Sequence, residues 1–153
     1  MRKIAVFTGT RAEYGLLYWI IKGLNDAKEI DLKLMVGGMH LSPEFGNTID
    51  EIKNDGFKID HSFEFLLSSE TPQGISKSMG LALISASEFF ERNRPDLLLV
   101  LGDRYEAFSV AQAAMIARIP IAHIHGGEIT KGLIDEAIRH SITLSLIHIS
   151  EPT

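Results

Sequence analysis

Short apolar runs alternate along the chain with longer stretches that carry apolar residues at helical spacing. The apolar runs predict strands at residues 3–7, 32–36, 58–66, 97–101 and 119–124. The longer stretches predict helices at residues 12–27, 48–55, 76–92 and 106–118, and another from about residue 133. Strands alternating with helices imply right-handed βαβ units. We therefore expect an α/β fold with a Rossmann-like parallel sheet and helices on both faces.

Composition narrows the class of protein. The chain has 153 residues, of which 45% are apolar and 23% charged, as in an ordinary globular domain. Its net charge of −5 argues against a nucleic-acid or anionic-membrane partner. The absence of cysteine excludes disulfides, thiolate metal sites and a cysteine nucleophile. We find no signal-peptide pattern and no apolar run of membrane-spanning length, and we expect a cytoplasmic protein.

Polar residues and glycines gather where the predicted strands end, which is where open parallel sheets bind ligands. Four strands end in such residues: Gly9-Thr10-Arg11, Gly37-Gly38-Met39-His40, Gly102-Asp103-Arg104 and His125-Gly126-Gly127-Glu128. Their convergence on one edge of the sheet predicts a binding site there.

The first and third of these strand ends each allow a structural alternative. Gly9-Thr10-Arg11 leads into a helix and could hold a phosphate, or it could only turn the chain and cap that helix. It matches neither a Walker loop nor a G-x-G-x-x-G fingerprint, so ATP and NAD are poorly supported. Asp103 could be a helix N-cap or a catalytic base, and Arg104 could pair with Asp103 or with a ligand phosphate.

The segment 119–140 brings imidazoles, carboxylates and a guanidinium to one strand end and the following helix, as proton transfer beside an anionic substrate requires. Asp135 and Arg139 are four residues apart, and the alternative for them is a surface ion pair. We interpret His123 as a buried core histidine and His125 as the functional one. Without a clear third ligand beside these two histidines, we expect no metal site.

Taken together, these motifs resemble the UDP-N-acetylglucosamine 2-epimerase family, in particular its hydrolysing branch, which opens sialic-acid biosynthesis. The matching stretches are residues 9–15, 37–41, 101–106, 123–128 and 134–140. The resemblance implies the N-terminal half of a two-domain fold of the GT-B type, with the substrate between two Rossmann-like halves. It implies a domain at residues 1–143 and full-length relatives that are homo-oligomers.

The resemblance also implies a reaction. UDP leaves UDP-GlcNAc by elimination across C1 and C2, and addition of water to the 2-acetamidoglucal yields N-acetylmannosamine, with no cofactor. The implied substrate-binding residues are Arg11, Gly15, His40 and Arg104. The implied catalytic residues are Asp103, His125, Glu128, Asp135 and Arg139, with the proton-transfer roles of His125 and Glu128 left open because some relatives carry a glutamate at position 125.

Residues 144–153 leave the family pattern abruptly, and we expect them to derive from sequence joined to a truncated reading frame. The second domain would then be absent and the chain inactive by itself. The alternatives are a hydrolysing epimerase of a UDP-2,4-diacetamido sugar, a GT-B glycosyltransferase, or a UDP-sugar binding module. A non-hydrolysing epimerase fits less well, because that branch differs at the first loop and around Asp103.

Overall fold

A six-stranded, all-parallel sheet forms the centre of the molecule, with the strand order β3-β2-β1-β4-β5-β6. The computed structural model describes residues 1–41, 48–63, 71–102, 104–124 and 150–151. The strands are β1 (Arg2–Thr8), β2 (Ile30–Val36), β3 (His61–Ser62), β4 (Leu97–Leu101), β5 (Ile121–Ile124) and β6 (Ser150–Glu151). The predicted Rossmann-like parallel sheet is confirmed.

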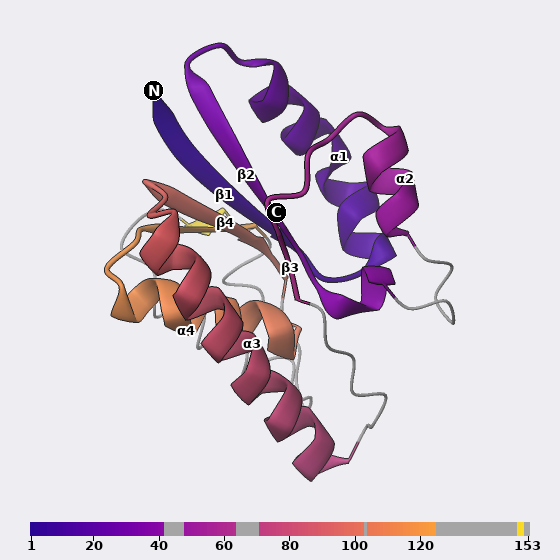
Figure 1. The fold of residues 1–153 in the computed structure, drawn as a ribbon, viewed down its shortest axis with the longest axis vertical. Coiled ribbons are helices and arrows are strands. Elements are labelled where there is room, and N and C mark those ends of the chain that lie inside the picture. The colour runs from indigo at the N-terminus through magenta and orange to yellow at the C-terminus, as the bar shows by residue number, and fades with distance from the viewer. Residues whose placement is uncertain (42–47, 64–70, 103, 125–149, 152–153) are drawn as a thin grey trace.

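Helices cover both faces of this sheet, as Figure 1 shows. The helices are α1 (Arg11–Asp26), the short 3-10 helix η1 (Gly38–Leu41), α2 (Ile49–Asn54), α3 (Pro72–Arg92) and α4 (Tyr105–Ile116). Helices α1 and α2 lie on one face, and α3 and α4 lie on the other. None of the helices among the described residues is long and apolar enough to cross a membrane.

The alternation of side chains along β1 explains why there are two cores. Ala5 and Phe7 point to one face and join the core cluster that contains Phe89 of α3 and Val110 of α4. Val6 points the other way and packs in the cluster formed with α1 and α2. All three β1 residues are at most 2% exposed, so β1 is buried on both faces like the inner strand of an α/β sheet.

Two predicted boundaries were wrong at places where a polar side chain or a cap decides the local structure. Helix α3 begins at Pro72 rather than at residue 76, because Thr71 caps it and accepts a 3.1 Å hydrogen bond from the Gly74 amide. The strand predicted at residues 58–66 is only His61–Ser62 among the described residues. The Asp60 carboxylate accepts a 2.8 Å hydrogen bond from the Leu34 amide, while the Asp60 amide donates to the Leu34 carbonyl oxygen at 2.9 Å. A side chain therefore takes the place of one backbone acceptor there.

Two further boundaries follow from backbone constraints. Helix α4 ends at Ile116, two residues before the predicted end, and Arg118 adopts a left-handed φ of 59°. Strand β5 begins only at Ile121, after Pro120, which has no amide hydrogen for the ladder. The helix predicted from about residue 133 lies outside the described residues. Strand β6 falls within the segment 144–153, whose foreign origin stays a prediction.

Candidate functional site

The turns that follow β1 and β2 touch each other through two glycines. A Cβ atom built on Gly37 would lie 2.9 Å from the Cα of Gly9, so a side chain at Gly37 has no space. The Gly37 amide donates a 2.8 Å hydrogen bond to the carbonyl oxygen of Thr8. The carboxyl ends of β1 and β2 are therefore joined in one tight unit, as the sequence led us to expect of neighbouring strand ends.

The start of α1 satisfies part of its own backbone. The Thr10 hydroxyl caps the helix and accepts a 3.2 Å hydrogen bond from the Glu13 amide. The Glu13 carboxylate reaches back to the Gly9 amide at 2.8 Å. Thr10 therefore caps the helix, while the phosphate site at this turn stays a prediction. The amides of Gly9 and Glu13 are therefore both used within the turn.

Arg11 is accessible to a ligand. Its side chain is 70% exposed and lies 3.6 Å from the Glu51 carboxylate of α2, measured from Nε. An ion pair at this exposure is worth about 0–1 kcal/mol, so a phosphate could displace it at small cost. Gly15 lies one turn further along α1, is exposed, and has no heavy atom within 4 Å of a built Cβ.

His40 is completely buried and links three segments. Its Nε2 atom lies 3.1 Å from the hydroxyl oxygen of Thr8, and its Nδ1 atom is hydrogen-bonded to the hydroxyl of Thr48. Thr8 donates its proton to the carbonyl oxygen of Thr10 at 3.4 Å, so the Nε2–H group of His40 donates to Thr8. Burial lowers the pKa of His40 to about 4, and the ring is neutral near pH 7. Both ring nitrogens of His40 therefore contact threonine hydroxyls inside the fold, and neither faces outward.

Arg104 begins the second arginine-bearing loop, after β4. It occupies the N-cap position of α4 without a side-chain capping bond, so the cap proposed for Asp103 falls on a different residue. Its Nε atom lies 3.8 Å from Oε2 of Glu106, and its guanidinium carbon lies 5.9 Å from the Tyr105 ring centroid. A Cβ atom on Gly9 would lie 3.0 Å from the same Glu106 oxygen. The loops after β1 and β4 therefore meet at Glu106.

His123 is a buried structural histidine, as interpreted from its apolar neighbours. It is 1% exposed, and its Nε2 atom lies 2.6 Å from the carbonyl oxygen of Gly102, so that nitrogen carries a proton and donates. Gly102 has a φ of 77°, in the left-handed region that favours glycine, and its amide donates to the carbonyl oxygen of Ile124 at 2.9 Å. These contacts hold the ends of β4 and β5 together.

The structure therefore places four of the predicted site residues: Arg11, Gly15, His40 and Arg104. The other predicted residues, Asp103, His125, Glu128, Asp135 and Arg139, lie outside the described part of the chain. Sequence reasoning missed Glu106 and the Thr8–His40–Thr48 network. A glutamate in the first turn of a helix was a usable signal for Glu106, whereas Thr8 and Thr48 carried no local signal.

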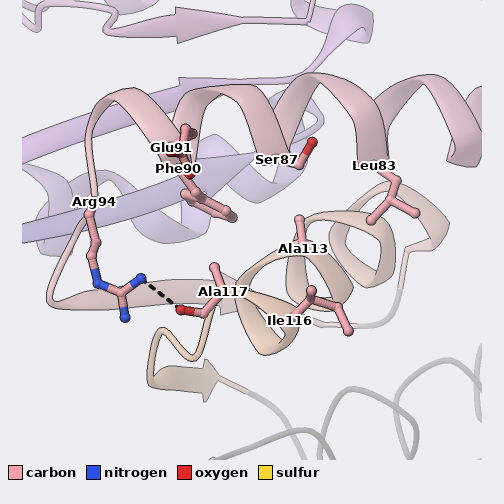
Figure 2. A pocket seen from close by; sticks show the side chains of 8 residues that line it. All are labelled: Leu83, Ser87, Phe90, Glu91, Arg94, Ala113, Ile116 and Ala117. Carbon is pink, nitrogen blue, oxygen red and sulfur yellow. Dashed lines mark hydrogen bonds between the residues drawn. The ribbon is translucent and has the colours of Figure 1, made fainter.

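Metal-ligating side chains and a pocket between two helices are two further features of the described residues. Among them, no group of three or more histidine, aspartate or glutamate side chains could hold a metal ion. A pocket of about 430 Å³ lies between α3 and α4 and is lined by residues that include Phe90, Arg94 and Ile116 (Figure 2). Arg94 donates a 2.7 Å hydrogen bond to the carbonyl oxygen of Ala117, shortly before β5 begins. The pocket thus lies toward the amino ends of the strands, away from the arginine loops.

The fold and this edge define a Rossmann-like domain with two arginine loops suited to an anionic ligand. A sequence profile of the UDP-N-acetylglucosamine 2-epimerase family matches residues 22–151. The chain belongs to that family. It is 45% identical over 151 residues to the polysialic acid biosynthesis protein P7 of Escherichia coli, covering 98% of this chain and 39% of that protein.

Two further relatives are similar to most of this chain. The GDP/UDP-N,N'-diacetylbacillosamine 2-epimerase (hydrolyzing) of Campylobacter jejuni is 43% identical over 148 residues, or 96% of this chain and 38% of that protein. The crystal structure of the Neisseria meningitidis UDP-GlcNAc 2-epimerase bound to UDP-GlcNAc has a TM-score of 0.80 at 23% identity, over 95% of this chain and 39% of that one. The chain thus spans about two-fifths of the length of the relatives it matches, as one half of a GT-B type fold would.

Proposed function

We propose that this chain supplies the N-terminal, nucleotide-sugar-binding half of a hydrolysing UDP-N-acetylglucosamine 2-epimerase. One structural observation carries the proposal: the loops after neighbouring strands β1 and β4 each present an arginine, Arg11 and Arg104, at the same edge of the sheet. Guanidinium groups bind phosphate oxygens through charge-assisted hydrogen bonds. We assign both to the diphosphate, with Gly15 beside them and His40 holding the turn.

In the proposed reaction, a base removes the proton from C2 while the bond between C1 and the UDP oxygen breaks. Water then adds to C1 of the glucal and a proton returns to the opposite face of C2, which gives N-acetylmannosamine and UDP. Asp103, Asp135 and the pair His125 and Glu128 are the proposed proton-transfer groups, with Arg139 neutralising charge near the reacting carbons. The scheme requires no cofactor.

A second candidate substrate is a UDP-2,4-diacetamido sugar. The specific observation in its favour is the name of the Campylobacter jejuni relative, which acts on diacetylbacillosamine nucleotides and is 43% identical. Both substrates share the UDP group and the C2 acetamido group, so the same two arginines serve either. The test is to incubate the protein made from a complete reading frame with each nucleotide sugar. The free sugar that is released identifies the substrate. Product that stays attached to UDP, or transfer to an acceptor, contradicts hydrolytic epimerisation.

We further propose that the chain alone has little epimerase activity, that it acts in the cytoplasm, and that the complete protein is a homo-oligomer. The support for low activity is the share of the relatives' length that the chain spans, 39% and 38%. If half of the cleft is missing, orientation of the reacting sugar is lost with it. Release of UDP from UDP-GlcNAc by the purified chain at an ordinary enzymatic rate contradicts this part of the proposal.

Binding by the chain itself tests the site directly. UDP is titrated into the ¹⁵N-labelled chain and followed by amide chemical shifts. Arg11→Ala is expected to weaken UDP binding about tenfold, the effect of one lost charge-assisted contact. Arg92→Ala is the matched control, because Arg92 is an exposed arginine at the end of α3. If the two substitutions changed the affinity for UDP equally, Arg11 would not be a residue of the UDP site.

A further inference from the structure

Glu106, in the first turn of α4, lies between the two arginine-bearing loops. Its Oε2 atom is 3.8 Å from Nε of Arg104, and its side chain is only 14% exposed. The same oxygen would be 3.0 Å from a Cβ atom built on Gly9, so it packs against the backbone of the β1–α1 turn. A single carboxylate therefore contacts both loops.

We propose that Glu106 is a positioning residue of the UDP-sugar site: its carboxylate, packed against the Gly9 turn, orients Arg104 relative to that turn. This inference rests on the proposed function, because it takes Arg104 as a diphosphate contact. Glu106 acts through Arg104, and the nucleotide does not touch it.

The physical reason lies in the freedom of an arginine side chain. The Arg104 side chain is 39% exposed, and a long side chain at this exposure loses rotamer freedom when contacts such as that with Glu106 order it. Ordering such a side chain on binding reduces affinity, whereas a guanidinium already held near its bound position avoids most of that loss. At 3.8 Å, Nε of Arg104 and Oε2 of Glu106 form an ion pair and no hydrogen bond with each other, and this ion pair favours one orientation of the arginine.

The surroundings of Glu106 make its charge costly for the fold. Burial raises the pKa of its carboxyl, and the pairing with Arg104 offsets this only in part. The Glu13 carboxylate lies near the same place, with one oxygen 3.2 Å from the Cβ built on Gly9. A folded-state pKa above the unfolded value stabilises the fold at low pH, and this contribution is lost as pH rises through the folded pKa. Because burial opposes a charge at this position, we expect the fold to tolerate a neutral glutamine there.

A positioning role and a purely structural role thus predict different outcomes for Glu106→Gln. If Glu106 only supported the fold, the substitution would lower the free energy of unfolding and affect binding through it. If Glu106 positions Arg104, the substitution weakens UDP binding while the free energy of unfolding at neutral pH stays equal or rises.

The experiment is a double-mutant cycle on UDP binding, measured by amide shifts of the full chain. Glu106→Gln should weaken UDP binding about three- to tenfold when Arg104 is present. In the Arg104→Ala background the same change only removes a negative charge, and the affinity should stay the same or rise. Glu88→Gln, an exposed glutamate on α3, is the matched control and should change the affinity less than about twofold.

Each result decides between the inference and the proposed function. If the wild-type chain binds UDP and Glu106→Gln weakens binding equally in both backgrounds, or in neither, the positioning role is wrong and the UDP site stands. If the wild-type chain shows no UDP-dependent shifts up to about 10 mM, the proposed function fails and the inference with it. Should Glu106→Gln fail to fold, Glu106→Asp replaces it in the cycle. That variant draws the carboxylate back from Arg104, and an unchanged affinity would contradict the positioning role.

Discussion

The imidazole of His40 lies 3.1 Å from the hydroxyl oxygen of Thr8, with no part of either residue exposed to solvent. The second ring nitrogen is bonded to Thr48, the residue that precedes α2, and this bond explains why the Thr48 side chain does not cap that helix. One neutral histidine therefore ties the end of β1 to the start of α2. The arrangement depends on the ring remaining uncharged.

The stability of the fold should consequently fall as His40 becomes protonated. Its folded pKa of about 4 lies below the ordinary value of 6.5, so the unfolded chain binds more protons between these pH values. From about pH 7.5 down to pH 5, this difference should cost about 2 kcal/mol of unfolding free energy. Urea unfolding followed by circular dichroism at several pH values measures it.

The matched variant for this prediction is His40→Gln, which keeps polar groups at the site but cannot titrate. It should be less stable than wild type near pH 7.5, and the difference should shrink toward pH 5. Parallel stability profiles of the two proteins would show that the titrating group is a different one.

Gly37→Ala should destabilise the fold because the new Cβ would lie 2.9 Å from the Cα of Gly9. Backbone must move to relieve such a contact, and overpacking of this kind costs about 1–3 kcal/mol. Gly80→Ala is the control, since Gly80 is exposed within α3 and a Cβ there meets no heavy atom within 4 Å. It should stabilise the helix by about 0.5–1 kcal/mol. A Gly37→Ala protein as stable as wild type would show that the two turns are loosely packed.

A comparison of Gly15→Ala with Gly23→Ala distinguishes an effect of helix propensity from an effect of ligand contact. Both lie in α1, and neither has a heavy atom within 4 Å of a built Cβ. Replacement of either by alanine should raise the free energy of unfolding by about 0.5–1 kcal/mol. Only Gly15→Ala should weaken UDP binding, because only Gly15 is assigned to the nucleotide site. If the two variants had equal affinities for UDP, Gly15 would not be a residue of that site.

Much of the fold could be read from local patterns. The alternation of apolar strands with amphipathic helices predicted the parallel sheet, and β1, β2 and β4 formed within a few residues of their predicted bounds. The errors fell where a single contact overrides a pattern. The Asp60 carboxylate accepts a hydrogen bond from the Leu34 amide, and among the described residues the strand predicted at 58–66 is found only at His61–Ser62. Such a contact joins residues 26 positions apart and leaves no periodic trace in the sequence.

For the candidate site, too, local sequence patterns predicted one part and contacts between distant segments decided the other. The residue types and spacing of the glycine and arginine motifs were sufficient to predict that strand ends converge and to identify the family, because those features are local in the chain. The tertiary structure alone decided that His40 is buried between Thr8 and Thr48, and that Glu106 bridges Arg104 and Gly9. Whether a polar side chain faces a ligand or its own fold depends on which segments the sheet order places beside it. Here β1 lies next to both β2 and β4, and that adjacency brings these residues together.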